Sequence, residues 1–337
     1  MKSRFPVLSL LSAVALLSCS QSSNKPSSQE KAAVTKPAVH PEPGFRLLNQ
    51  RSGFKTAFAK PNTDKVPPEK PPIELFDLVR YSAPLGTNAA YVTPVRVGEK
   101  RPAIVWIHGG FDFGIDSFAW EPGSPEDDQS ASAFREAGLV LMLPSLRGTN
   151  DSPGENECFL GEVDDVIAAG RYLLSRPDVD PKRIYLGGHS TGGTMVLLAA
   201  ASSDFFRGVF AFGATLSVLS YGDSSCVPES ASEQEQLLRT PAFFFQDVTT
   251  PTVLIEGAME GNGPYEIPSE FLGNAPISTV IVPGTTHFSV LRPGSQVVAE
   301  AILRDTREQP SFRITAEAIA KQMSGETDHA KGAGLAQ

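Results

Sequence analysis

Ser190 lies at the centre of the pentapeptide GHSTG at 188–192, directly after an apolar stretch at 183–188 and directly before a helix-like stretch at 191–202. A serine on a sharp turn between a strand and a helix is exposed at the carboxyl end of the sheet. The following helix points its amino-terminal N–H groups at the same place. Flanking glycines are required there because a side chain would collide with the neighbouring backbone. The placement of this motif therefore predicts that Ser190 is a nucleophile.

A serine hydroxyl becomes a good nucleophile only when a neighbouring base takes its proton. The chain has five histidines, and four of them occupy unsuitable places: the polar N-terminal segment, the C-terminal tail, the residue after an upstream strand, and the serine turn itself (His40, His329, His108 and His189). The fifth, His287, follows the apolar stretch at 279–282. A loop at the carboxyl end of that strand can carry the imidazole over Ser190, so His287 is the predicted base.

The imidazole needs an anionic partner on its other nitrogen. No aspartate occurs between Pro251 and His287, and the acids there are all glutamates (Glu256, Glu260, Glu266 and Glu270). Glu256 lies at the end of a strand, where we expect its side chain to be buried beneath the site or turned away. Glu260 lies on the loop just beyond that strand and is the predicted acid, with Glu266 as the alternative.

The oxyanion that forms when a hydroxyl attacks a carbonyl needs a pair of N–H donors. The sequence HGGF at 108–111 follows an apolar stretch at 103–107, and its glycines allow the backbone to approach a substrate closely. We expect the donors to be the backbone N–H of Thr191 and one from Gly110 or Phe111. Aromatic residues in the loops beyond the strands could line a pocket for the substrate (Phe111, Phe113, Phe118, Trp120 and Tyr221).

The elements that must position these residues alternate along the chain. The stretches 76–81 and 89–94 are typical of an antiparallel pair of strands, and nearly continuous apolar runs typical of strands buried on both faces follow at 103–107, 139–143, 183–188, 208–214, 252–257 and 279–282. Helix-like stretches lie between them at 131–138, 161–176, 191–202 and 295–306. This alternation predicts an α/β fold with a mainly parallel, eight-stranded sheet and helices on both faces.

With these residues in view, the chain resembles an α/β-hydrolase over about residues 73–308, with the order serine, acid, histidine. The segments 146–150, 161–193 and 239–257 are similar to the catalytic domain of the prolyl oligopeptidase family, which includes dipeptidyl and acylaminoacyl peptidases. The chain departs from that family in three ways: it has no room for an N-terminal β-propeller, its acid must be a glutamate, and Phe111 follows the HGG where many members have proline. The resemblance implies the fold and a serine hydrolase reaction, but not peptidase specificity.

The N-terminal residues 1–18 combine Lys2 and Arg4 with an apolar run, which is typical of an export signal. The sequence LLSC that ends at Cys19 resembles a bacterial lipobox, and this resemblance implies cleavage before Cys19 and lipidation of its thiol. The alternative is an ordinary cleaved signal in which Cys19 is incidental. The expected location is therefore the bacterial cell envelope, on the periplasmic or surface side, with a lipid anchor as the contact with the membrane.

Residues 19–72 are rich in Ser, Pro, Lys and Ala and are predicted to be a flexible tether, in which only the segment 44–54 could dock on the body. The catalytic domain is predicted at 73–310. Residues 311–337 form a C-terminal extension whose small and polar end, from Gly325, we expect to fray.

Composition narrows the class of partner. The formal net charge of -9 argues against binding to nucleic acid.

Cys158 and Cys226 both fall in loops on the active-site side of the predicted sheet, and an exported compartment permits their oxidation, but the sequence leaves open whether they are bridged. Neither cysteine lies in a Cys-x-x-Cys pair, so no structural zinc site is expected.

These observations predict a serine hydrolase that cleaves an ester or amide bond of a small molecule or short peptide through an acyl-enzyme, without metal or cofactor. Two alternatives from other classes are a non-catalytic binding protein on this fold and a structural lipoprotein of the envelope. The sequence does not indicate the oligomeric state.

Overall fold

The computed structural model describes residues 46–63, 65–259, 267, 269–306, 308, 310 and 312–333. The strands of this part of the chain are β1 (Lys60–Pro61), β2 (Asp77–Ala83), β3 (Gly86–Val92), β4 (Arg101–Ile107), β5 (Val140–Pro144), β6 (Glu155–Asn156), β7 (Val179–His189), β8 (Val209–Phe212), β9 (Thr252–Gly257) and β10 (Ile277–Val282). The helices are α1 (Leu47–Arg51), α2 (Ser132–Glu136), α3 (Glu162–Leu173), α4 (Thr191–Ser202), α5 (Glu233–Leu237), α6 (Ser269–Leu272), α7 (Leu291–Arg304) and α8 (Ala316–Ala333). Short 3₁₀ helices lie at Ser117–Ala119, Val218–Ser224 and Pro241–Asp247.

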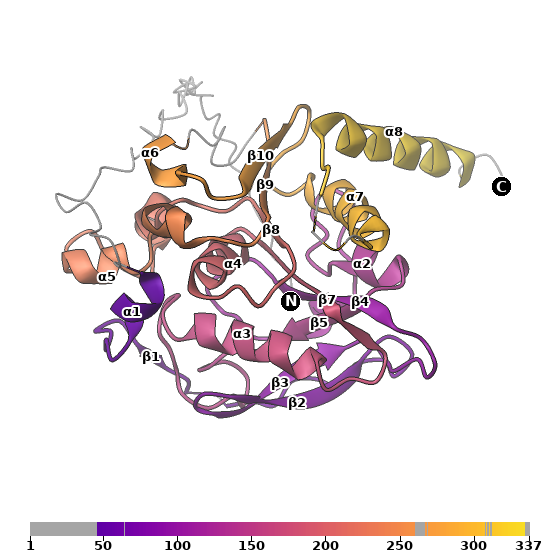
Figure 1. Cartoon of the computed structure of the whole chain (residues 1–337). Helices are drawn as coiled ribbons and strands as arrows, with labels where there is room; N and C mark the ends of the chain where they lie inside the picture. The colour runs from indigo at the N-terminus through magenta and orange to yellow at the C-terminus, as the bar shows by residue number, and fades with distance from the viewer. Residues whose placement is uncertain are drawn as a thin grey trace, which may run out of the picture. The chain divides into compact units, whose positions relative to one another are not determined.

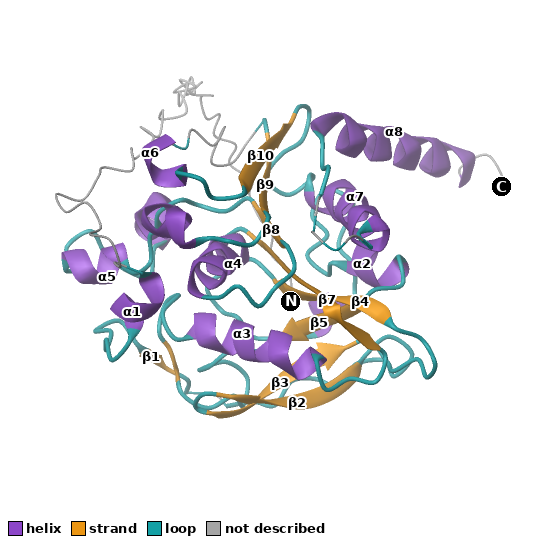
Figure 2. Cartoon of the chain, in the orientation of Figure 1, coloured by secondary structure: helices purple, strands orange, loops and turns teal. Residues whose placement is uncertain are grey.

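The central sheet of the described residues has eight strands in the order β10-β9-β8-β7-β4-β5-β3-β2 (Figure 2). The six strands from β10 to β5 pair in parallel, β3 pairs with β5 antiparallel, and β2 pairs with β3 antiparallel. The prediction of a mainly parallel, eight-stranded α/β sheet is confirmed. Because the parallel strands share one carboxyl edge, the loops that leave them meet there.

Helices cover both faces of this sheet (Figure 1). The core on one face includes the apolar residues of α3 and α4, and the core on the other includes those of α2 and α7. Strands β4 and β5 are buried along their whole length, as their continuous apolar runs predict. Helix α4 is buried from Thr191 to Ala201, so its amino-terminal end is held rigidly against the sheet edge.

The described part of the predicted tether, residues 46–63 and 65–72, is called the N-terminal arm, and it packs on the α/β body. Leu47 is fully buried in the core, and the guanidinium of Arg51 donates to the carbonyl of Leu160 at 2.6 Å and to the carboxylate of Asp164 at 2.9 Å. Strand β1 pairs with β6. Leu47 and Arg51 belong to the segment 44–54, the one part of the predicted tether that was expected to dock, whereas the pairing of β1 with β6 extends the contact beyond that segment. A segment too polar to form its own core can still bury single residues on an existing surface. Residues 19–45, with Cys19, lie outside the described residues.

At the other end of the chain, α8 continues to Ala333, past the point at Gly325 where we expected fraying. Ala, Glu, Lys, Gln and Met, which favour helix, make up most of α8, and each of its two glycines, Gly325 and Gly332, costs only about 1 kcal/mol. Among the described residues, no helix has the length and apolar character needed to cross a membrane.

Candidate active site

The turn between β7 and α4 carries Ser190 in a strained backbone conformation with φ 54° and ψ -115°. A Cβ on Gly188 would lie 2.6 Å from the carbonyl oxygen of Gly192, and a Cβ on Gly192 would lie 2.1 Å from that of Ile107. Both flanking glycines are therefore required, as the sequence predicts. The amide of Ser190 donates to the carbonyl of Phe212 at 2.8 Å, which fixes the turn against the end of β8.

His287 lies on the loop after β10 and reaches the same end of β8. An added Cβ on Gly213 would lie only 2.3 Å from Cε1 of His287, so the imidazole rests directly on the backbone of Gly213. The amide of Ser190 donates to the carbonyl of Phe212, the residue before Gly213. The predicted nucleophile and the predicted base therefore both contact the peptide unit Phe212–Gly213. The imidazole is mostly buried, with 15% of its side chain exposed.

The carboxylate that contacts this imidazole belongs to Glu256, near the carboxyl end of β9. Its Oε2 lies 3.3 Å from Nδ1 of His287, and its side chain is fully buried. Its Oε1 accepts from the backbone N–H of Gly257 at 2.8 Å, so the carboxylate is held in place. Such a pair fixes the tautomer of the histidine and stabilises its protonated form.

Our expectation for Glu256 is therefore wrong in part, because the side chain is buried but reaches the base. The loop after β10 folds over the end of β9. A Cβ added to Gly257 would lie only 2.3 Å from the carbonyl oxygen of Thr286. A glycine directly after a strand-end glutamate was the signal of this close approach. Glu260, the predicted acid, and Glu266, the alternative, lie outside the described residues.

The HGG loop after β4 lies against the serine turn. Thr191 Oγ1 donates to the carbonyl of Gly110, and an added Cβ on Gly109 would lie 3.4 Å from Cβ of Ser190. Gly110 has φ +97° and open space around it, while the side chain of Asn156 donates to the carbonyl of Phe111 at 3.0 Å. Within the described residues, the amide N–H groups of Thr191, Gly110 and Phe111 make no hydrogen bond, so these N–H groups can donate to a further partner.

The aromatic residues near this loop divide into two groups. Phe111 and Tyr221 pack edge to face at 5.2 Å, and Phe159, which the sequence did not indicate, stacks on Tyr221 at 6.2 Å. Trp120 instead packs against Tyr91, in the core on the opposite face of the sheet. Tyr221 also contacts Thr194 of α4 through its hydroxyl at 2.7 Å, and burial raises its pKa to about 12, so it is neutral.

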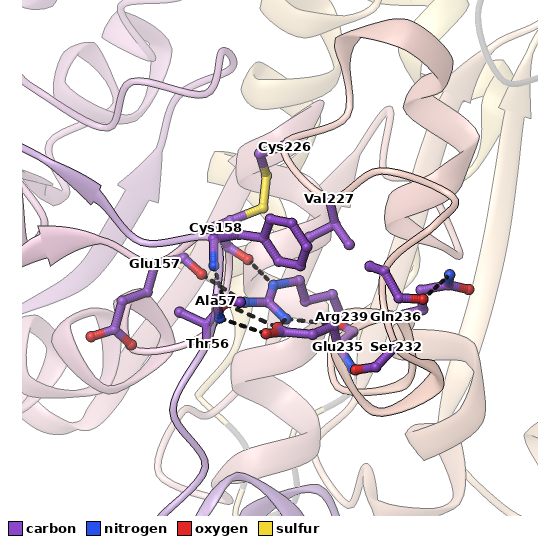
Figure 3. Close-up of polar contacts among 12 residues, drawn as sticks. Thr56, Ala57, Glu157, Cys158, Cys226, Val227, Ser232, Glu235, Gln236 and Arg239 are labelled. Atoms are coloured by element: carbon purple, nitrogen blue, oxygen red, sulfur yellow. Dashed lines mark hydrogen bonds and ion pairs between the residues drawn. A yellow bond between two sulfur atoms is a disulfide. The ribbon is translucent and has the colours of Figure 1, made fainter.

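The buried guanidinium of Arg239 and the disulfide between Cys158 and Cys226 join the segment that follows Tyr221 to the rest of the site (Figure 3). Cys158 and Cys226 are bonded through sulfur, with their Cα atoms 5.9 Å apart. Arg239 is fully buried and donates to the carbonyls of Cys158 and Glu157, to the carboxylate of Glu235 at 2.6 Å and to the hydroxyl of Thr56 at 2.8 Å. Arg239 therefore ties the arm to the Cys158 side of the disulfide and to helix α5, a role that the sequence did not reveal.

The side chains that could bind a metal ion do not form a cluster in the described residues. Among the described residues, no group of three or more His, Cys, Asp or Glu side chains is arranged to bind one. His108, which follows β4, is instead engaged in its own loop, with Nδ1 and Nε2 each 2.7 Å from a carbonyl oxygen, those of Gly109 and Gly114.

Comparison with known sequences gives one family match. Residues 125–275 match the model of the prolyl oligopeptidase family. The chain is 29% identical over 143 residues to the uncharacterized peptidase YtmA of Bacillus subtilis, which covers 38% of this chain and 55% of that protein. It is 26% identical over 159 residues to carboxylesterase 3B of Mus musculus, which covers 43% of this chain and 26% of that protein. The chain thus spans about half or less of the length of these relatives.

Solved structures show the same fold at low identity. The acylaminoacyl peptidase of Pyrococcus horikoshii has a TM-score of 0.55 at 17% identity, over 72% of this chain and 43% of that one. A puromycin-hydrolyzing peptidase of Mycobacterium tuberculosis has a TM-score of 0.54 at 20% identity, over 68% and 39%. An esterase has a TM-score of 0.53 at 16% identity, over 68% and 81%. The chain therefore has the α/β-hydrolase fold, and its residues 125–275 carry the sequence pattern of the prolyl oligopeptidase family.

Proposed function

We propose that this protein is a serine hydrolase that cleaves an ester or amide bond through an acyl-enzyme. Ser190 is the nucleophile, His287 the general base and acid, and Glu256 the carboxylate that orients the imidazole. The single observation that carries the proposal is the contact of Glu256 with Nδ1 of His287, beside the peptide unit that holds Ser190. With Nδ1 engaged by a carboxylate, Nε2 is free to take the proton of the serine hydroxyl.

The reaction follows from these roles. Ser190 Oγ attacks the substrate carbonyl while His287 takes the hydroxyl proton, and the oxyanion accepts hydrogen bonds from the N–H of Thr191 and from that of Gly110 or Phe111. His287 then gives the proton to the leaving alcohol or amine. A water molecule, deprotonated by the same imidazole, releases the acyl group and restores Ser190.

The substrate class we propose is a small ester or short peptide. The relatives support both chemistries, since one is named a peptidase and the other a carboxylesterase. A cavity of about 500 Å³ is lined by Phe111 and Asp112, at the end of the HGG loop, and by Lys60 and Lys65 of the N-terminal arm, but not by Ser190 or His287. A cavity of this volume could hold a part of a small substrate away from the bond that is cleaved.

A fluorophosphonate probe tests the reaction class directly. We expect covalent labelling of the wild-type protein at Ser190, no labelling of Ser190→Ala, and turnover of p-nitrophenyl acyl esters or aminoacyl anilides by the wild type alone. Labelling of Ser190→Ala to the wild-type extent would show that another residue reacts and would refute the assignment. A matched control is Ser217→Ala, since Ser217 lies in the loop after β8 and its hydroxyl contacts Thr240 at 3.3 Å.

We further propose that the protein is exported and anchored by a lipid on Cys19. The support is the signal-like sequence of residues 1–18, together with a disulfide, which persists in oxidising compartments. Metabolic labelling with radioactive palmitate should mark the wild type and leave Cys19→Ala unmarked. Equal labelling of both proteins would contradict the anchor.

A further inference from the structure

His189 precedes the nucleophile, and its side chain is 1% exposed. Its Nε2 lies 3.2 Å from the backbone carbonyl oxygen of His287, and its Nδ1 lies 3.0 Å from Oε1 of Gln129. The imidazole therefore connects the serine turn with the loop that carries the base. Nothing in the proposed reaction so far gives this buried ring a role.

The ring of His189 also packs against the ring of the base. The two imidazole centroids are 4.6 Å apart, with 43° between the ring planes. Phe288 packs edge to face on both rings, at 5.5 Å from His189 and 4.9 Å from His287, and forms the solvent side of the cluster with 43% exposure. The imidazole of His287 is thus supported by a ring on one side and by the backbone of Gly213 on another.

His189 is uncharged at neutral pH. Burial, followed by the neighbouring imidazoles of His287 and His108, lowers the pKa of His189 to about 3. A neutral ring has one N–H, and the carbonyl oxygen of His287 can only accept, so Nε2 carries the proton. Gln129 can turn its amide N–H toward Nδ1, because Asp127, which accepts from that amide at 2.7 Å, is exposed and can be hydrated instead.

We propose that His189 is a positioning residue: its Nε2–H holds the carbonyl of His287 and its ring supports the imidazole, so that the base keeps its place beside Ser190. This inference rests on the proposed function, because it concerns the same proton transfer. Misplacing a reacting group by about 1 Å can lower the rate about 100-fold. A neutral ring also adds no positive charge next to the imidazolium that forms on His287 during turnover.

Three substitutions separate the hydrogen bond from the bulk of the ring. His189→Gln keeps an N–H donor that reaches as far as Nε2, His189→Asn is the same amide shortened by one methylene, and His189→Leu has no donor. We expect kcat to fall about 100-fold in His189→Asn and His189→Leu, with KM within about threefold of the wild type. His189→Gln should regain at least about tenfold of that loss. If His189 had a purely structural role, the kcat values of His189→Gln and His189→Asn would not differ in this way.

Two results would overturn the positioning role: a kcat within about threefold of the wild type in all three variants, or equal losses in the two amide variants. The wild-type protein offers a test that needs no variant, since ¹⁵N chemical shifts of the imidazole report its protonation. They should show a neutral ring with the proton on Nε2 between pH 5 and 8, and a cationic ring or a proton on Nδ1 would refute the proposal. Full activity in His287→Ala would instead refute the proposed function itself.

Discussion

Replacing Glu256 by glutamine changes one oxygen of the carboxylate that contacts the base. The backbone N–H of Gly257 can still donate to Oε1 of the amide, so the side chain keeps its place. The NH₂ group of the glutamine then faces Nδ1 of His287 and donates to it. The proton of the neutral imidazole moves to Nε2, where it blocks acceptance of a proton from Ser190.

The size of the effect follows from the geometry. Oε2 of Glu256 and Nδ1 of His287 are 3.3 Å apart, and the two side chains are 0% and 15% exposed, so water screens them little. With an effective dielectric constant of about 20, Coulomb's law gives about 5 kcal/mol for the carboxylate and the imidazolium. At about 1.36 kcal/mol for each factor of ten, we expect kcat to fall by three to four orders of magnitude.

The assay is the steady-state hydrolysis of a p-nitrophenyl ester, with melting temperatures measured alongside to show that the variants fold. Glu260→Gln is the matched control, because it makes the same change four residues along the chain, at the acid that the sequence favoured. We expect Glu260→Gln to keep kcat within about threefold of the wild type. The reasoning fails if Glu260→Gln loses three orders of magnitude while Glu256→Gln keeps more than about a tenth of the activity.

Three further outcomes follow from particular contacts. Gly213→Ala should lower kcat at least about 100-fold in a folded protein, because its Cβ would lie 2.3 Å from Cε1 of His287 at φ +57°; wild-type kinetics would contradict this. Cys158→Ser with Cys226→Ser should cost about 4 kcal/mol in denaturant unfolding, since the bond closes a loop of 68 residues; an unchanged midpoint would contradict it. Burial raises the pKa of Glu162 to about 7, so the wild type should lose stability as pH rises from about 4.5 through 7. Thermal unfolding from pH 5 to 8 should show Glu162→Gln gaining about 3 kcal/mol relative to the wild type, and parallel pH curves would refute this.

The sequence predicted the elements whose signals are local. Strand β9 begins and ends at the predicted residues, and so does helix α4, because an uninterrupted apolar run and a glycine turn mark their ends. Ser190 could be singled out because its glycine-flanked turn lies directly between a strand pattern and a helix pattern, although the backbone that makes Gly192 necessary belongs to Ile107 on another strand. These predictions depend on periodicity and turn chemistry, which a single sequence contains.

The acid and the particular contacts of the arm could not be predicted in this way, because both depend on which distant segments meet. Glu256 and His287 are 31 residues apart, and their contact depends on how the loop after β10 folds over Gly257. Leu47 has no apolar periodicity around it that would predict a helix, yet the backbone N–H of Leu47 donates to the carboxylate of Asp247, 200 residues along the chain. The composition of a segment indicates whether the segment can form a core by itself. It does not indicate which of its residues can be buried against the surface of the folded body.

Arg239 shows how such distant contacts act on the candidate site. Its guanidinium is buried, and a buried charge is tolerated only when every donor finds a partner. The partners come from three segments: Thr56 of the arm, the carbonyls next to the disulfide, and Glu235 on the same helical turn. Removing any of these groups leaves a buried charge incompletely paired, so the arm, the disulfide loop and the segment that carries Tyr221 are stabilised together. The arm is therefore as much a part of the catalytic body as the strands are.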